Sequence, residues 1–538
     1  MNVADLVHEH AGNRPYDEAI VDVAAETSVT WGELDARVDA LANGFAAAGF
    51  VAGQRVALAL TNSRTFVVTY LAVARAGLVA VPMNPRSATG ELVRVLADSG
   101  ARLAVGDAVS VATLRSAVGG LQDALESADE EVRRRSPVPV LAVEGVLPLP
   151  GEHAFADLAA APGRPVVSPA DRENLAVLLY TSGTSGRPRG AMLSHRALLA
   201  NIGQVAAIEP APTRADDVVL GLLPLFHVFG LNAVLGQVLA HGARLVLVDR
   251  FDAEQTLRVV AEHGVTNIPL APPVVAAWAG WPLATELLAS VRIVLSGAAP
   301  LDPDLRALFV QSSGVPVEQG YGLTEAAPVV TSTLSSGARA AGREPVPAGV
   351  GGPVPGVEIQ ARDAAGAVLL DDPGQIWVRG ANLFSGYWPD GEQAPGGDGW
   401  WPTGDVGLVD RDGDLVLVDR LRELVIVNGF NVYPTEVEEV IAELPEVAQV
   451  AVVGVPDELT GEAVVAFVVA DDGAGDVSGA SAADPLTDRV RAHCERRLAR
   501  YKRPREVTVV EGLPHSATGK VAKGRLRAQA RRSALGLT

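Results

Sequence analysis

Cysteine is almost absent from the sequence, and positive charge is scarce. The 538 residues contain one cysteine, Cys494, which excludes an intramolecular disulfide and favours a reducing compartment, expected to be the cytoplasm. Lys and Arg total 44 against 64 Asp and Glu, and the net charge of −20 argues against nucleic acid or an anionic membrane as a partner. The first ten residues, MNVADLVHEH, have no basic or apolar run, so no secretory signal is expected.

Lysine is also rare. Lys502, Lys520 and Lys523 are the three lysines among the 44 basic residues, and arginine supplies the remaining positive charge. A lysine ammonium is a compact point charge on a flexible stem, whereas guanidinium is a broad planar fork. These three positions are therefore the first to inspect for a function that arginine does not serve.

One long segment, residues 218–240, contains no Asp, Glu, Lys or Arg. Its length would allow it to span a bilayer. However, Gly221, Pro224, His227 and Gly230 divide it into short pieces. We therefore predict a buried strand, a loop and a buried helix, and no transmembrane segment.

Helical and strand patterns alternate over most of the chain. Residues 33–49 predict an amphipathic helix, and RVALAL at 55–60 predicts a buried strand. Such alternation is typical of an α/β protein whose parallel sheets are covered by helices. Between about 335 and 420, short apolar runs separated by Pro, Gly and Asp predict a small antiparallel β unit.

The segment YTSGTSGRPRG at 180–190 is the sharpest chemical signal. It follows the apolar run NLAVLLY, and an amphipathic helix is predicted to begin near Ser194. A strand, a glycine-rich loop and a helix together wrap backbone N–H groups around phosphate, and hydroxyl side chains add donors. The loop lacks the GxxxxGK[ST] pattern of a Walker A motif, so it predicts a phosphate site of another kind.

This segment closely resembles the phosphate-loop signature of the adenylate-forming enzymes, which include acyl-CoA synthetases, peptide-synthetase adenylation domains and luciferases. Six further blocks follow in the order of that family: PLFHVFG at 224–230, LSGAAPL at 295–301, QGYGLTE at 319–325, GWWPTGD at 399–405, VDRLRELVIVNGFNVYP at 418–434 and LPHSATGK at 513–520. The seven blocks span nearly the whole chain. The phrases GFNVYP and LPLFHVFG look most like the medium- and long-chain fatty acyl-CoA ligase branch.

The resemblance implies a fold and a domain boundary. We expect an adenylation domain over residues 1–420, made of two layered αβ lobes and the small β-barrel-like unit. A smaller, mobile α+β C-terminal domain over residues 421–538 would carry Lys520.

The resemblance also implies a first half-reaction, in which a carboxylate joins the α-phosphate of ATP and pyrophosphate leaves. Two anions must meet, so catalysis depends on neutralising charge and on positioning. Lys520 matches the lysine that reaches both the carboxylate and the α-phosphate. Glu325, with Thr184, is expected to hold the Mg²⁺ that bridges the ATP phosphates, because oxygen ligands suit that ion.

The remaining ATP and AMP contacts are carried over on the matching blocks. Thr324 would donate to the α-phosphate, Tyr321 would stack on adenine beside Gly297 and Ala298, and Asp405 would accept the ribose hydroxyls with support from Arg420. The complete set of expected nucleotide-binding residues is Thr181, Ser182, Gly183, Thr184, Ser185, Gly186, Arg189, Gly297, Ala298, Tyr321, Gly322, Thr324, Asp405 and Arg420.

In the second half-reaction a thiol attacks the acyl-adenylate, after the C-terminal domain has rotated. By resemblance the hinge lies at Arg422, and Gly429 lines the pantetheine tunnel, where a side chain would obstruct the thiol. The basic stretch from Arg489 to Arg532 is a candidate contact for the phosphates of CoA, or else a solvated helix face. No tightly bound organic cofactor is expected.

The uncharged segment is expected to line the acyl pocket. The family uses the histidine that matches His227, and the aromatic that matches Phe229, near the bound carboxylate; a satisfied core histidine is the alternative. Gly230 and Ala233 are small, which favours an open apolar channel over a tight pocket for a ring.

The sequence departs from the family at two positions. Residue 189 is Arg where Lys is usual, and an arginine can still neutralise the β- and γ-phosphates. Residue 428 is Asn where Gly or Ser is frequent, which bears on the tunnel entrance and on CoA as the thiol.

We therefore predict an ATP- and Mg²⁺-dependent ligase that converts a medium- or long-chain fatty acid to acyl-AMP and then to acyl-CoA. Two alternatives remain within the family: a fatty-acyl-AMP ligase that loads a carrier protein, and an aryl-acid CoA ligase. Outside these, a non-catalytic sensor of acyl-AMP would not need Lys520, Glu325 and Asp405 together, and nothing specific favours a light-emitting oxygenase. The expected partners are small molecules, and neither nucleic acid nor more than peripheral membrane contact is expected.

Overall fold

The computed structural model describes residues 1–126, 130–160, 166–168, 171–181, 189–281, 283–420, 423–427, 430–457, 460–471, 480–498, 500–515 and 520–534. The chain divides into two compact units. The first contains Met1–Glu358, Val378–Trp401 and Asp412–Asp414, and the second contains Ile359–Trp377, Pro402–Arg411 and Leu415–Thr538. This division assigns parts of the predicted β unit to the second unit. The domain boundary at residue 420 remains a prediction.

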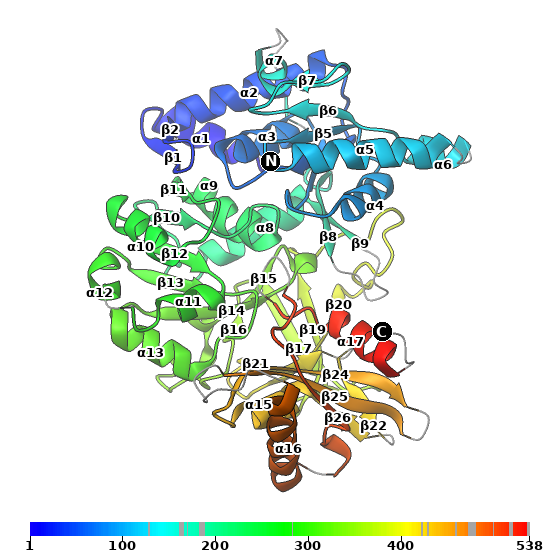
Figure 1. Cartoon of the computed structure of the whole chain (residues 1–538). Helices are drawn as coiled ribbons and strands as arrows, with labels where there is room; N and C mark the ends of the chain where they lie inside the picture. The colour runs from blue at the N-terminus through cyan, green and yellow to red at the C-terminus, as the bar shows by residue number, and fades with distance from the viewer. Residues whose placement is uncertain are drawn as a thin grey trace. The chain divides into compact units, whose positions relative to one another are not determined.

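The N-terminal part of the first unit is built around a seven-stranded sheet (Figure 1). Its strands, in the order of pairing, are β7 (His153–Ala154), β6 (Val140–Val143), β5 (Leu103–Gly106), β3 (Arg55–Ala59), β4 (Val79–Pro82), β8 (Leu175–Thr181) and β9 (Arg189–Ser194). The pairs from β7 to β8 are parallel, and β8 and β9 are antiparallel. Strands β4 and β5 are buried at every residue, as expected where helices cover both faces of a parallel sheet.

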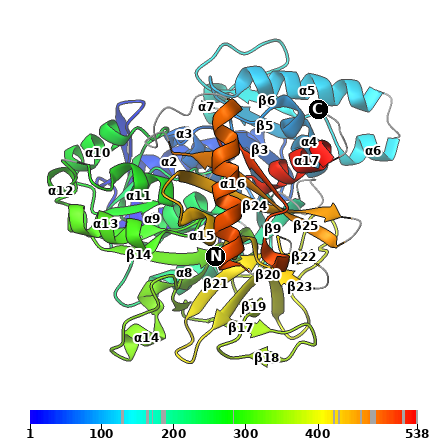
Figure 2. The same cartoon turned by 60° about the horizontal axis from the view of Figure 1, so that its bottom comes forward.

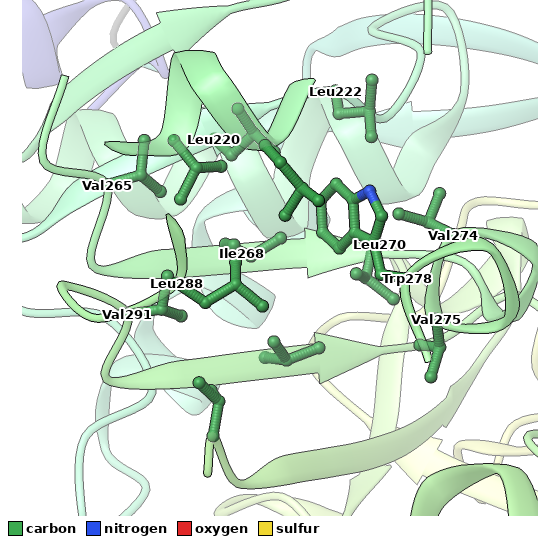
Figure 3. Packing of buried hydrophobic residues seen from close by; sticks show 14 of the residues in the cluster. Leu220, Leu222, Val265, Ile268, Leu270, Val274, Val275, Trp278, Leu288 and Val291 are labelled. Atoms are coloured by element: carbon green, nitrogen blue, oxygen red, sulfur yellow. The ribbon is translucent and has the colours of Figure 1, made fainter. Parts of the chain in front are cut away.

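A nine-stranded sheet forms the rest of this layered architecture. Its strands, in the order of pairing, are β16 (Gly352–Pro353), β15 (Val329–Ser332), β14 (Val317–Gly322), β13 (Ile293–Ser296), β12 (Asn267–Leu270), β10 (Val218–Gly221), β11 (Arg244–Leu247), β1 (Glu18–Asp22) and β2 (Thr27–Thr30). Figure 3 shows how Trp278 packs among aliphatic side chains from these strands and the nearby helices, such as Ile268 and Leu270. The indole Nε1 of Trp278 donates to the Ala253 carbonyl at 3.0 Å, so this large side chain is buried with its polar atom satisfied.

The helices of the first unit begin and end at local sequence signals. Thr30 and Glu33 form a capping box at the start of α2, and α13 begins with Asp302 followed by Pro303. The α-helices of this unit are α1 (Asp5–Asn13), α2 (Trp31–Ala47), α3 (Arg64–Arg75), α4 (Thr89–Ser99), α5 (Val111–Glu126), α6 (Glu130–Arg135), α7 (Phe155–Ala160), α8 (His195–Ala206), α9 (Gln237–His241), α10 (Ala253–Glu262), α11 (Pro272–Trp278), α12 (Ala284–Leu287), α13 (Pro303–Ser313) and α14 (Gly337–Ala340).

A five-stranded sheet occupies most of the segment predicted as a β unit. Its strands, in the order of pairing, are β18 (Val368–Leu369), β17 (Val357–Arg362), β19 (Gly374–Gly380), β20 (Trp400–Val409) and β21 (Leu415–Arg420). The β17–β18 and β20–β21 pairs are antiparallel, as predicted.

The C-terminal part of the second unit is an α+β structure. Its sheet contains β23 (Phe430–Val432), β22 (Val425–Val427), β25 (Gly461–Ala470) and β24 (Val447–Asp457), and β26 (Glu506–Val509) pairs with β25. Helices α15 (Pro434–Ala442) and α16 (Ala480–Arg497) contribute to the hydrophobic cluster on one face, and α17 (Lys523–Ala534) contributes to the cluster on the other (Figure 2). Neighbouring residues of β24 alternate between the two clusters, Val452 in the first and Val453 in the second.

The uncharged segment 218–240 forms the predicted succession of strand, loop and helix. Strand β10 is followed by a loop, the π-helical segment η1 (Phe229–Gly236) and helix α9. Among the residues that the structure describes, no helix combines the length and the apolar character that crossing a membrane requires. The expected α/β class with a large N-terminal and a small C-terminal domain is confirmed.

Candidate active site

The predicted phosphate loop joins two antiparallel strands. Tyr180 pairs with Gly190 and Thr181 pairs with Arg189, so β8 and β9 form an antiparallel hairpin. Helix α8 begins at His195, and its N-cap Ser194 accepts the N–H of Ala197, as predicted. However, β9 separates the loop from the helix. The predicted order of strand, loop and helix therefore contains one additional strand, β9, before the helix.

Arg189 lies at the end of this hairpin and stacks on an aromatic ring. Its guanidinium carbon is 3.7 Å from the centre of the Tyr387 ring, and its Nη1 donates to Gln393 Oε1 at 3.0 Å. A planar guanidinium can stack in this way, whereas a lysine ammonium offers no planar group. The stacking gives a physical account of why arginine stands where the family usually has lysine.

Glu325 is buried, and the backbone around it is held on several sides. It lies in the short 3₁₀ segment η2 (Thr324–Ala326), which begins two residues after β14. The Glu325 carbonyl accepts the N–H of Phe384 at 2.8 Å, and the Ala326 carbonyl accepts Asn382 Nδ2 at 2.7 Å. These two hydrogen bonds fix the backbone position from which the Glu325 side chain extends.

The hydroxyl of Tyr387 donates to Glu325 Oε1 at 2.6 Å, and both residues are buried. Tyr387 was not among the predicted site residues. It lies 62 residues away from Glu325 in the sequence, and no pattern links them. The segment that carries it pairs with β9 through an isolated bridge between Tyr387 and Ala191, which no local sequence signal reveals.

The predicted adenine subsite lies at the ends of β13 and β14. Gly297 is buried directly after β13, and Ala298 has a φ of 72°, a left-handed conformation that is uncommon for a residue with a side chain. Tyr321 is buried in β14, and a Cβ on the following Gly322 would lie 2.3 Å from the Pro328 carbonyl oxygen. Gly322 is thus required by a close backbone approach.

Phe229 of the predicted acyl pocket contacts Gly297 of the predicted adenine subsite. A Cβ on Gly297 would lie 2.8 Å from Cε1 of Phe229, so the Phe229 ring lies against this glycine. Phe229 is half-buried at the start of η1. His227 Nδ1 accepts the Phe229 N–H at 3.3 Å.

The two small residues of this pocket differ in their surroundings. Gly230 is buried, and a Cβ there would lie 2.3 Å from the Pro224 carbonyl oxygen, whereas Ala233 is half-buried. Packing of η1 against the preceding loop therefore explains the glycine at 230. The argument that Gly230 marks an open channel is not supported.

Asp405 and Arg420 are register partners in the second unit. They lie opposite each other in the antiparallel pair of β20 and β21, and the support of Asp405 by the Arg420 side chain stays a prediction. Asp405 is buried, and its N–H donates to Thr403 Oγ1 at 3.1 Å. A buried carboxylate suits the predicted role as acceptor for ribose hydroxyls.

The three lysines have different surroundings, all in the second unit. Lys502 donates to both carboxylate oxygens of Glu436, at 2.5 and 2.7 Å. Lys523 lies 2.8 Å from Glu438 Oε1 and 3.1 Å from Glu423 Oε2. Lys520 is exposed, directly before an isolated bridge between His515 and Val521. The ion pairs of Lys502 and Lys523 indicate structural roles for these two lysines, and Lys520 is the exposed candidate for chemistry.

Several predicted residues lie outside the described part of the chain. They are Ser182, Gly183, Thr184, Ser185 and Gly186 of the phosphate loop, the predicted hinge Arg422, and Asn428 and Gly429 of the predicted tunnel.

The described residues fit a magnesium ion that is held jointly by protein and ATP. They contain no group of three or more His, Cys, Asp or Glu side chains able to hold a metal ion alone. Mg²⁺ is commonly bound by one or two carboxylates together with substrate phosphates and water. Glu325 would supply such a carboxylate, and its Oε1 accepts the hydroxyl of Tyr387.

Two family models match the chain, that of the AMP-binding enzyme over residues 7–388 and that of the AMP-binding enzyme C-terminal domain over residues 436–520. The first covers more than half of the sequence. The chain therefore belongs to the AMP-binding enzyme family, within the adenylate-forming superfamily, and the resemblance seen in the seven blocks is confirmed.

Relatives match the chain over nearly its full length. It is 35% identical to 4-coumarate–CoA ligase 5 of Oryza sativa subsp. japonica, over 98% of this chain and 94% of that protein. It is 34% identical to a feruloyl-CoA synthase of Amycolatopsis sp., over 93% of this chain and 94% of that protein.

Solved structures match equally broadly. ATP-bound MatB from Rhodopseudomonas palustris is 30% identical with a TM-score of 0.83, over 99% of both chains. A Mycobacterium tuberculosis fatty acyl CoA synthetase is 28% identical with a TM-score of 0.74, also over 99% of both.

Proposed function

We propose that the protein is an AMP-forming acid–CoA ligase whose substrate is an aromatic carboxylic acid. The full-length similarity to a 4-coumarate–CoA ligase and a feruloyl-CoA synthase is the observation that carries this proposal. The contact between Phe229 and Gly297 adds support, because a flat aromatic side chain beside a glycine offers a surface on which a ring can stack.

In the first step, a carboxylate oxygen attacks the α-phosphorus of ATP, an acyl–O–P bond forms, and pyrophosphate leaves. Lys520 brings a positive charge to the carboxylate and the α-phosphate, and Arg189 neutralises the β- and γ-phosphates. Asp405 accepts the ribose hydroxyls, and Tyr321 stacks on adenine. Glu325 would hold Mg²⁺, which would neutralise charge on the phosphates.

In the second step, the thiolate of CoA attacks the acyl carbonyl, the carbon–oxygen bond to AMP breaks, and AMP leaves with the electron pair. Arg422 as hinge and Gly429 as part of the tunnel are proposed for this step on family resemblance.

A fatty acid is the second candidate substrate. Its support is the similarity to the mycobacterial fatty acyl CoA synthetase. The small size of Gly230 does not favour a fatty acid, because backbone packing accounts for a glycine at this position.

Product analysis by mass spectrometry tests the proposal. The full chain is incubated with ATP, Mg²⁺ and a mixture of 4-coumarate, ferulate, benzoate, octanoate and palmitate, with and without CoA. Aryl-CoA that forms only when CoA is present supports the proposal, whereas consumption of the fatty acids alone replaces the aryl substrate with the second candidate. Acyl-AMP that accumulates unchanged after CoA is added indicates transfer to a carrier protein instead.

A further inference from the structure

The segment that follows β19 is placed against β9 by backbone hydrogen bonds. Ser385 donates to the Met192 carbonyl at 2.9 Å, and Trp388 donates to the Gly190 carbonyl at 2.8 Å. Tyr387, between these two donors, forms the isolated bridge with Ala191. Its backbone is thereby fixed beside the strand that ends the phosphate-loop hairpin.

The same segment also holds the backbone of η2. Phe384 donates to the Glu325 carbonyl at 2.8 Å, and Asn382, which is fully buried, donates to the Ala326 carbonyl at 2.7 Å. The Phe384 and Tyr387 rings are 5.0 Å apart in an edge-to-face arrangement, so Tyr387 has a packed neighbour on its own segment.

One side chain therefore contacts both the expected metal ligand and the expected phosphate ligand. The Tyr387 hydroxyl donates to Glu325 Oε1 at 2.6 Å, and the Arg189 guanidinium lies 3.7 Å from the ring centre. The hydrogen bond occupies Oε1 and restricts the orientation of the carboxylate, so Oε2 is the candidate ligand for a cation. Such partners of metal ligands often set metal affinity.

We infer that Tyr387 is a positioning residue for the Mg²⁺ complex of ATP: its hydroxyl orients Glu325, and its ring holds Arg189. This inference rests on the proposed function for the identity of the nucleotide and the metal. The hydroxyl and the ring can be tested separately, because Tyr387→Phe removes the hydroxyl and keeps the ring.

The test measures metal binding directly, without turnover. Mn²⁺ replaces Mg²⁺ and is titrated by electron paramagnetic resonance into the full chain with a non-hydrolysable α,β-methylene ATP. Tyr387→Phe removes the hydroxyl and keeps the ring, and is expected to weaken Mn²⁺ binding about tenfold. Tyr387→Leu removes both, and is expected in addition to weaken binding of the nucleotide measured without metal. Tyr70→Phe, at another buried tyrosine, is the control.

A second comparison separates positioning from general destabilisation. In a Glu325→Ala chain, Tyr387→Phe is expected to leave the residual Mn²⁺ affinity unchanged, because the carboxylate that it positions is gone. The inference is overturned if Tyr387→Phe lowers Mn²⁺ affinity equally in the parent and the Glu325→Ala chain. It is also overturned if Tyr387→Phe leaves the Mn²⁺ affinity of the parent chain unchanged. Production of acyl-CoA by the parent chain is assayed separately. If the parent chain forms no acyl-CoA but the Mn²⁺ titrations give the expected results, the proposed function is wrong and the positioning role of Tyr387 stands.

Discussion

The ammonium nitrogen of Lys523 lies 2.8 Å from Oε1 of Glu438, and this ion pair joins the first residue of α17 to α15. Glu423 adds a second carboxylate at 3.1 Å. Burial by itself lowers the pKa of Lys523, but the charges and hydrogen bonds of the two carboxylates outweigh burial, so the pKa is raised. The contact with Glu423 connects a residue close to Lys520 with one next to the predicted hinge at Arg422.

Replacing Lys523 should destabilise the protein. Lys523→Met leaves two largely buried carboxylates without their cation, and we expect the free energy of unfolding to fall by about 3 kcal/mol. Because the folded pKa lies above the unfolded value of about 10.4, the contribution is complete below that pH and is lost as the pH rises through the folded pKa. Urea unfolding between pH 7 and 11 measures both effects. Lys523→Arg keeps the charge and is the matched control; equal stability of the Met variant and the parent would contradict the prediction.

Lys520 should matter for only one of the two half-reactions. Lys520→Ala is expected to lower adenylation by roughly 10²–10³, the scale for losing one preorganised donor, and to leave thioester formation from preformed acyl-AMP nearly intact. Pyrophosphate exchange measures the first step, and conversion of synthetic acyl-AMP with CoA measures the second. An equal fall in both steps would argue against rotation of the C-terminal domain between them.

Gly297 should tolerate a side chain only if Phe229 is made smaller. In Gly297→Ala the new Cβ would lie 2.8 Å from the Phe229 ring, and displacement of the ring is expected to raise the KM for the acid roughly tenfold. Adding Phe229→Leu should recover much of this loss, because the shorter side chain vacates the space. Gly203→Ala is the control, since a Cβ there meets no atom within 4 Å. A loss that persists in the double variant would place the cause elsewhere.

His195 should make the fold sensitive to acid. Burial lowers the pKa of His195 to about 4, against the opposing charge of Asp5. The unfolded value is about 6.5, so the stability that the neutral ring provides is complete above that pH and is lost as the pH falls towards 4, by about 3 kcal/mol in total. His195→Gln has no titrating group but can still accept the Val3 N–H, which His195 Nδ1 accepts at 3.3 Å. Unfolding curves at pH 7, 5.5 and 4.5 should show a steeper loss in the parent than in this variant; parallel losses would contradict the assignment.

The sequence by itself determined the family, the α/β class and the local structure of most elements. Apolar runs such as 55–60 became buried strands, Ser194 became a helix cap, and the glycines and proline of 218–240 divided that segment as predicted. These features are local, because periodicity and capping depend on residues within a few positions of each other.

Only the tertiary structure decided which distant residues meet. The hydrogen bond between Tyr387 and Glu325 spans 62 residues, and it exists because the segment after β19 lies beside β9. The same holds for Phe229 and Gly297, and for the Pro224 backbone that requires a glycine at 230. Which strands become neighbours depends on the packing of whole layers, and the periodicity of one segment does not predict it.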